Sequence, residues 1–131
     1  QNLNNLFEEQ LPELIEKCNE FGVKALIGSS GSFDSFIEMI WIAKGPSKLA
    51  SSVKQEEFNL DEVKSLHNRL IENGYDTRKA IPGLVPMRVD TIHLASHMVQ
   101  WTLRHCSLER LLLSSYALKE GVLHRVMENR L

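Results

Sequence analysis

Hydrophobic residues recur at helical spacing along most of this chain. Residues 3–20 predict an amphipathic helix that Pro12 kinks or restarts, because proline cannot donate the backbone hydrogen bond of a helix interior. Further helices are predicted at residues 33–41, 60–71 and 117–128, with one more turn at 75–81 and a long helix at 87–104. The pattern indicates a helix-rich protein.

Two short segments are apolar almost without interruption and predict buried strands. They are Val23 to Ile27, broken only by Lys24, and Arg110 to Ser114. Strands of this kind need cover on both faces, and a two-stranded sheet is too small to provide it. We therefore expect an α/β fold whose sheet is incomplete, with the missing part in a preceding segment or in another copy.

A polar segment lies between the predicted helices at residues 33–41 and 60–71. Residues 45–58 predict a polar loop after Gly45-Pro46-Ser47. Asn59, with Glu62 three residues later, is typical of a capping box and places the next helix start.

The length of 131 residues predicts one domain, and the charge narrows its partners. A formal net charge of −2 gives no reason to expect nucleic acid or an acidic membrane surface as a partner.

The chain contains two cysteines, Cys18 and Cys106. So few cysteines suit a reducing compartment, although one disulfide between them is the alternative. The chain begins at Gln1 inside a helical pattern, so we expect a piece of a longer protein.

A glycine- and serine-rich turn separates the first predicted strand from the next helix. It consists of Gly28, Ser29, Ser30, Gly31 and Ser32. Such a turn can hold an anion, because glycine lets the backbone approach and the helix start presents free N–H groups. It can equally be a structural connection with Ser30 or Ser32 as N-cap.

Four segments in order resemble the exopolyphosphatase / guanosine pentaphosphate phosphohydrolase family. They read LIGSSGSFDSF, NLDEVKSLHNRL, IPGLVPMRVDTIHLASHMV and LLLSSYALKEGVL, and the resemblance runs from about Val23 to the C-terminus. The resemblance implies a partial actin-like (ribonuclease H-like) domain, the C-terminal half of a longer core, with residues 1–131 as one domain. It implies a cytoplasmic hydrolase of polyphosphate or guanosine pentaphosphate that uses magnesium and whose partner is its own N-terminal half.

The resemblance also assigns site residues. Gly28–Ser32 matches the family's second glycine-rich loop, which faces the phosphate cleft, and Arg88 and Asp90 match its Arg-x-Asp. Glu120 lies in Leu118-Lys119-Glu120-Gly121, which matches the family's Leu-Arg-Glu-Gly.

The chain departs from the family pattern in several places. Serines stand where the loop usually has threonines, Lys119 replaces an arginine, and Ser96 stands where a glycine is common. The first phosphate loop, the Asp-Ile-Gly-Gly-Gly-Ser segment and the general-base glutamate all lie N-terminal to the matched region. We therefore assign no catalytic residue here and expect the chain alone to be inactive.

Structural roles compete with the assigned ones. Arg88 and Asp90, two apart, cannot face each other on a helix, so capping or bridging is the favoured role and cleft lining the alternative. For Glu120 the favoured role is a solvated first-turn glutamate, stabilised by the helix dipole.

His93 and His97 share one helix face, four residues apart, as helical metal ligands do. HLASH lacks the glutamate of HExxH and a third ligand, so we predict no metal site. The alternative to a hydrolase is a non-catalytic interaction module, which dimerises or binds a partner through its apolar strands and long helix.

Overall fold

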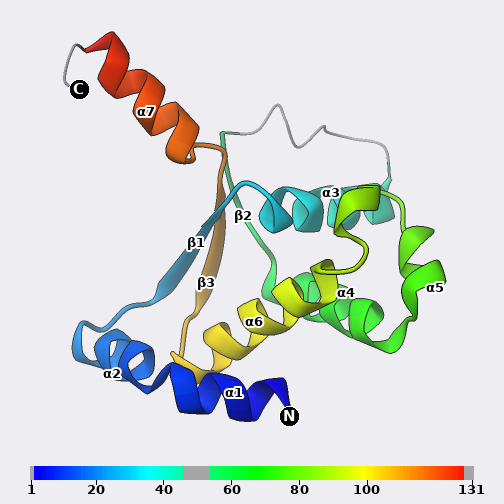
Figure 1. Ribbon diagram of the computed structural model, residues 1–131, viewed down its shortest axis with the longest axis horizontal. Coiled ribbons are helices and arrows are strands. Elements are labelled where there is room, and N and C mark those ends of the chain that lie inside the picture. Colours follow the sequence, from blue (N-terminus) through cyan, green and yellow to red (C-terminus); the bar gives the residue numbers. More distant parts are fainter. Residues whose placement is uncertain (1, 46–53, 129–131) are drawn as a thin grey trace.

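The computed structural model describes residues 2–45 and 54–128 and shows a mixed α/β fold rich in helices (Figure 1). The elements are α1 (Leu3–Gln10), α2 (Pro12–Glu20), β1 (Ala25–Ser29), α3 (Ser32–Lys44), β2 (Gln55–Glu57), α4 (Leu60–Glu72), α5 (Tyr75–Lys79), a 3₁₀ turn (Pro86–Arg88), α6 (Ile92–His105), β3 (Arg110–Ser114) and α7 (Leu118–Met127). This order confirms the expected α/β class.

The sheet has three strands in the order β1-β3-β2. β1 and β3 are parallel, with Ala25 opposite Arg110 and Ser29 opposite Ser114. β2 pairs antiparallel with β3, so the prediction of a loop over residues 45–58 is wrong at Gln55–Glu57. These polar residues carry no strand pattern of their own; pairing with β3 holds them, helped by an ion pair between Glu57 and Arg110. Residues 46–53 of that predicted loop lie outside the described residues.

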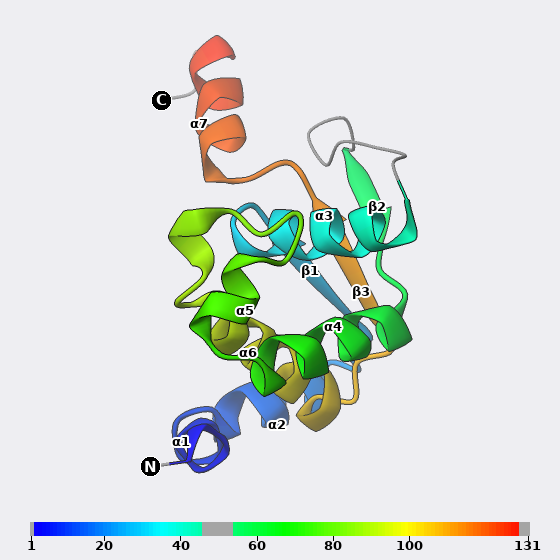
Figure 2. The same ribbon diagram turned by 90° about the vertical axis from the view of Figure 1, so that its right-hand side faces the viewer.

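Helices α3, α4 and α6 cover one face of the sheet (Figure 2). Leu111 and Leu113 of β3 point into this core and are 0% and 1% exposed. Ile27 of β1 lies on the other face and is 65% exposed. The described chain thus covers one face of its sheet, whereas on the second face Ile27 is exposed although its neighbour Leu112 is buried.

The helix boundaries follow local signals. Pro12 starts α2, as predicted, and Asn59 caps α4 by accepting hydrogen bonds from the N–H groups of Asp61 and Glu62 at 2.9 and 3.2 Å. The Glu62 side chain instead forms an ion pair with Lys44 at 2.6 Å. The predicted helix over residues 87–104 is wrong at its start, because Pro86–Arg88 forms a separate 3₁₀ turn and α6 begins only at Ile92.

α7 projects away from the rest of the molecule (Figure 1). Its apolar side chains are 47–84% exposed: Leu118, Val122, Leu123, Val126 and Met127. Among the described helices, none combines the length and apolar character that a membrane span requires.

Candidate functional site

The glycine- and serine-rich segment is part strand and part turn. Gly28 and Ser29 close β1, and the chain reverses at Ser30 and Gly31, both with φ near +59°. A Cβ atom at Gly28 would lie 2.1 Å from the Phe33 ring, so Gly28 lets that ring pack on the strand. Gly28 is therefore covered, whereas Ser29 and Ser30 are exposed.

The N-terminus of α3 carries no side-chain cap. Gly31 occupies the N-cap position, so the expectation of Ser30 or Ser32 as a capping residue is wrong. Ser30 adopts a left-handed conformation, and Ser32 is already the first helical residue. The Phe33 N–H donates to the Ser30 carbonyl at 3.2 Å. No described side chain supplies a capping oxygen, so the other N–H groups at the start of α3 stay available to an external acceptor.

Arg88 lies against this turn. A Cβ atom at Gly31 would stand 3.2 Å from Nη1 of Arg88 and 3.4 Å from Nη2, so the guanidinium covers the glycine. The ion pairs of the described chain do not include Arg88. The cleft-lining alternative for Arg88 thus has the geometry that it needs.

A groove of about 620 Å³ joins the turn to α6. Its polar part comes from Ser29–Ser32 and Arg88. Its apolar part comes from Leu14, Leu26, Phe33, Ala95, Met98 and Val99, with Thr102 at one side. An anion at the polar end would meet a guanidinium and an open helix start together.

Asp90 is not part of this groove. It is exposed in the turn before α6, and its carboxylate raises the pKa of His93, although burial and the nearby Arg78 guanidinium outweigh it and lower that pKa overall. Asp90 and Arg88 form no ion pair with each other among the described residues. Of the two members of the Arg-x-Asp pair, only Arg88 therefore lines the groove.

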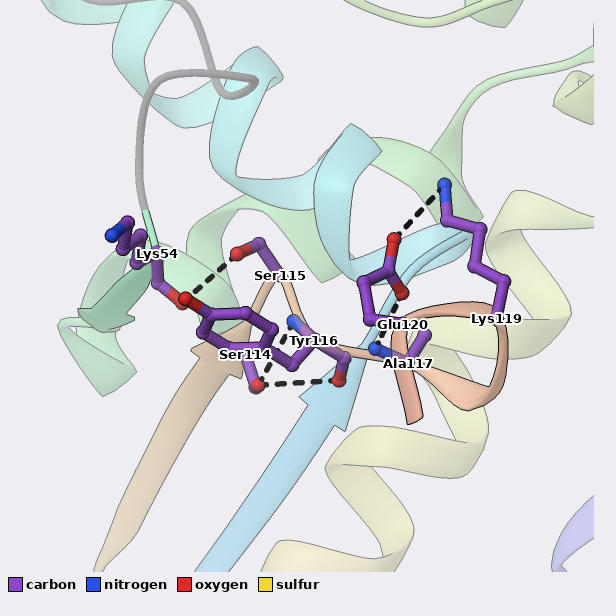
Figure 3. A network of polar contacts seen from close by, with 7 residues as sticks. All are labelled: Lys54, Ser114, Ser115, Tyr116, Ala117, Lys119 and Glu120. Atoms are coloured by element: carbon purple, nitrogen blue, oxygen red, sulfur yellow. Dashed lines mark hydrogen bonds and ion pairs between the residues drawn. The ribbon is translucent and has the colours of Figure 1, made fainter. Parts of the chain in front are cut away.

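Glu120 stabilises the start of α7 (Figure 3). Its carboxylate accepts a hydrogen bond from the N–H of Ala117 at 2.9 Å and pairs with Nζ of Lys119 at 3.3 Å. The backbone hydrogen bond from Ala117 and, more weakly, Lys119 lower the pKa of Glu120 against partial desolvation. Alanine has no acceptor side chain, so only the glutamate half of a capping box exists here. This geometry agrees with the favoured structural role.

A second cavity, of about 560 Å³, lies at the carboxyl ends of β1 and β3. Such ends are where α/β folds commonly bind ligands. Its lining consists of Ser30, Asp34, Glu38, Lys54, Ser115, Tyr116, Ala117, Lys119 and Glu120. Ser114 Oγ accepts the Tyr116 N–H at 3.2 Å, and Ser115 bonds the Lys54 carbonyl, which fixes the loop after β3 (Figure 3).

Sequence reasoning missed part of this second cavity. Asp34 and Glu38 are four residues apart on α3, a spacing that places both on one helix face. Lys54 reaches the cavity only because β2 pairs with β3, a contact that sequence spacing does not reveal.

The histidine pair of α6 does not form one site. His97 Nε2 hydrogen-bonds Asn4 Oδ1 at 2.9 Å, whereas His93 Nδ1 is buried without a partner among the described residues. Within residues 2–45 and 54–128, no group of three or more His, Cys, Asp or Glu side chains is arranged to hold a metal ion.

Comparisons with known proteins identify relatives by structure. No family model matches the chain, and neither does any curated protein. It is similar to an exopolyphosphatase from Cytophaga hutchinsonii, with 28% identity and a TM-score of 0.88 over 96% of this chain and 40% of that one. A Ppx/GppA family member from Aquifex aeolicus shares the fold, with 17% identity and a TM-score of 0.66 over 95% of this chain and 42% of that one.

The chain spans about two fifths of the length of these solved structures. The resemblance seen in the four sequence segments is confirmed over nearly the whole chain. This chain is a structural relative of the exopolyphosphatase / guanosine pentaphosphate phosphohydrolase family.

Proposed function

We propose that this chain is the C-terminal half of the core of a phosphoanhydride hydrolase that acts on inorganic polyphosphate or guanosine pentaphosphate. The observation that carries the proposal is the contact between the Arg88 guanidinium and Gly31 at the open start of α3. The similarity to the C. hutchinsonii exopolyphosphatase supports the same reading.

Phosphate binding by this chain would rest mainly on Arg88. An exposed helix start contributes about 0.3–1 kcal/mol towards an anion. A charge-assisted hydrogen bond contributes about 1.5–3 kcal/mol, and a guanidinium can donate two in parallel. Ser29, Ser30, Gly31 and Ser32 add backbone or hydroxyl donors around it, while Gly28 supports the turn by admitting Phe33.

The reaction would need groups from the preceding half of the protein. Water attacks the terminal phosphorus, its proton passes to a glutamate there, and the bond from phosphorus to the bridging oxygen breaks. Magnesium would neutralise the developing charge. The described residues fit no complete metal site, and Glu120 is already engaged with Ala117 and Lys119, so the metal ligands would come from elsewhere.

The proposal includes the location and the form of the whole protein. We place it in the cytoplasm, as a core whose N-terminal half completes both the sheet and the cleft, with the actin-like (ribonuclease H-like) topology. This chain alone would bind phosphate weakly and turn over no substrate.

A second candidate is a non-catalytic interaction or regulatory module, which the exposed apolar side chains of α7 and Ile27 favour. In that case, the same surfaces would bury against a partner or a second copy, and phosphate compounds would not bind at the Arg88 groove.

Orthophosphate release tests the two functions. Long-chain polyphosphate and guanosine pentaphosphate, each with magnesium, are offered to this chain and to the full-length protein. We expect release by the full-length protein alone, and a loss of activity in Arg88→Gln but not in Arg69→Gln, which removes the same charge from α4. Absence of orthophosphate release by both proteins would favour the interaction module. Turnover by this chain alone would contradict the assignment of the base to the preceding half.

A further inference from the structure

A polar cavity of about 250 Å³ lies between α1, α4 and α6 and plays no part in the proposed function. Its polar lining comprises Asn4, Glu8, His67, His97, Gln100, Arg104 and His105. Three helices that are distant in sequence therefore bring three imidazoles, one guanidinium and two amides to one place.

The cavity lies on the opposite side of α6 from the Arg88 groove. Ala95, Met98 and Thr102 of α6 line that groove, whereas His97, Gln100 and Arg104 line the cavity. At 3.6 residues per turn, these two sets occupy opposite faces of the helix. A ligand in the cavity would thus be separated from the groove by the width of α6.

Hydrogen bonds hold the histidine rings at the cavity wall. His67 Nδ1 bonds Ser96 Oγ at 2.8 Å, and His97 Nε2 donates to Asn4 Oδ1 at 2.9 Å. The two rings have centroids 5.6 Å apart. His105 Nδ1 donates to the Trp101 carbonyl at 2.8 Å, and its Nε2 lies 4.0 Å from Glu8.

The charge balance favours an anion. Arg104 brings a permanent positive charge and forms none of the ion pairs found in the described chain. Glu8 is the one carboxylate of the lining, and it lies beside His105. A guanidinium and amide groups are donors that match a tetrahedral oxyanion, with the guanidinium able to bind two oxygens at once.

A metal ion fits the same cavity poorly. The permanent positive charge of Arg104 in the lining repels a cation. No trio of ligand side chains suited to a metal exists among the described residues.

We propose that this cavity binds a small oxyanion with the chemistry of orthophosphate. The proposal does not rest on the proposed function, although orthophosphate is what that function would release.

A titration with inorganic phosphate, followed by nuclear magnetic resonance of the histidine rings, tests the site. Ionic strength is kept constant with chloride, and the Arg88→Gln variant is used throughout, so that the groove does not contribute. We expect saturable shifts of the His67 and His97 ring signals. Arg104→Gln in that background weakens binding about tenfold or more, because a charge-assisted hydrogen bond is lost.

Arg69→Gln is the matched control, since it removes the same charge from α4 outside the cavity. Unchanged affinity in this variant supports a local site. Shifts that fail to saturate, or equal weakening by both substitutions, would overturn the proposal. Because Arg104 is exposed, the test does not depend on a core substitution, and the Arg88→Gln background keeps its result independent of the groove.

Discussion

Apolar side chains are buried in the helical body of the molecule, which consists of α3, α4, α6 and the sheet face that they cover. They are exposed on the opposite side, here called the β1–α7 side, which consists of the other face of β1 and of α7. In the body, Leu70, Ile92 and Leu111 are each fully buried among α4, α6 and the sheet. On the other side, Ile27 of β1 and Leu118 of α7 are 65% and 84% exposed, respectively. The body is packed as a closed hydrophobic core, whereas the β1–α7 side carries large apolar side chains that no other part of the described chain covers. The contrast identifies the apolar surface that the described chain leaves exposed.

Core truncation gives the largest expected effect. Leu70→Ala should lower the free energy of unfolding by about 2–5 kcal/mol, because it removes a buried side chain and leaves a cavity. Leu118→Ala, which removes the same atoms from an exposed site, should change it by less than about 0.5 kcal/mol. Urea denaturation measures both. Equal losses would mean that α7 packs on the body in solution.

Self-association is the next largest effect. The outer edge of β1 has no strand partner in the described chain, and α7 offers apolar side chains, so we expect the isolated chain to associate. Burying one leucine contributes about 1.5–3 kcal/mol, so Leu123→Glu should weaken association about tenfold or more. Sedimentation velocity over a range of concentrations measures it.

A chain that stays monomeric at every concentration would count against association through the β1 edge and α7. Lys64→Glu serves as the control, because it changes the charge at an exposed position of α4, away from the β1–α7 side.

Two glycines with the same backbone conformation allow a sharper test of the groove. Gly31 and Gly22 have φ of +59° and +60°, but only Gly31 lies against Arg88, while nothing lies within 4 Å of a Cβ atom at Gly22. A β-branched residue at either position carries strain of about 1–3 kcal/mol. We expect Gly31→Val to abolish phosphate binding at the groove while the helices persist, and Gly22→Val to leave binding intact. Calorimetry measures phosphate binding and circular dichroism measures helix content. Undiminished binding in Gly31→Val would refute the loop assignment.

Acid sensitivity of the body is the smallest expected effect. Burial, followed by His97 and Arg104, lowers the pKa of His67 below its ordinary 6.5, and burial and Arg78 do the same for His93. Below pH 6.5 the unfolded chain therefore binds more protons than the folded one. The stability that the neutral rings contribute is complete above pH 6.5 and is lost as pH falls through 6.5 towards the lowered pKa values.

Denaturation midpoints recorded across this range measure the effect. His67→Gln should show a shallower decline, with His93 supplying the remainder. An identical decline in both proteins would exclude His67 as a contributor.

Most of the helices could be predicted from the sequence because their signals are local. The restart at Pro12 and the cap at Asn59 depend on residues within one turn, and both were found where expected. β2 could not be predicted, since Gln55–Glu57 has no apolar pattern and forms only by pairing with β3, more than 50 residues away. Likewise, the apolar spacing does not show that α6 begins only at Ile92, after the 3₁₀ turn at Pro86–Arg88 and the buried Val89.

The site divides in the same way. The glycine-rich turn is visible in the sequence, but its partner Arg88 lies 57 positions from Gly31 and is brought to it by α3 and the turn before α6. Spacing alone favoured a structural role for Arg88, because arguments from neighbouring residues cannot place a side chain across the fold. The family resemblance implies a role for both residues, and the structure shows that the Arg88 guanidinium lies against Gly31.

The strand order β1-β3-β2 has a consequence for synthesis. Both outer strands pair only with β3, which is the last strand of the described chain to be made. β1 must therefore wait for about 80 residues to be added before it finds its partner, which at about 5–20 residues per second takes several seconds. During that time, the edge of β1 that later pairs with β3 stays open in the nascent chain, and a chaperone would meet it in that state.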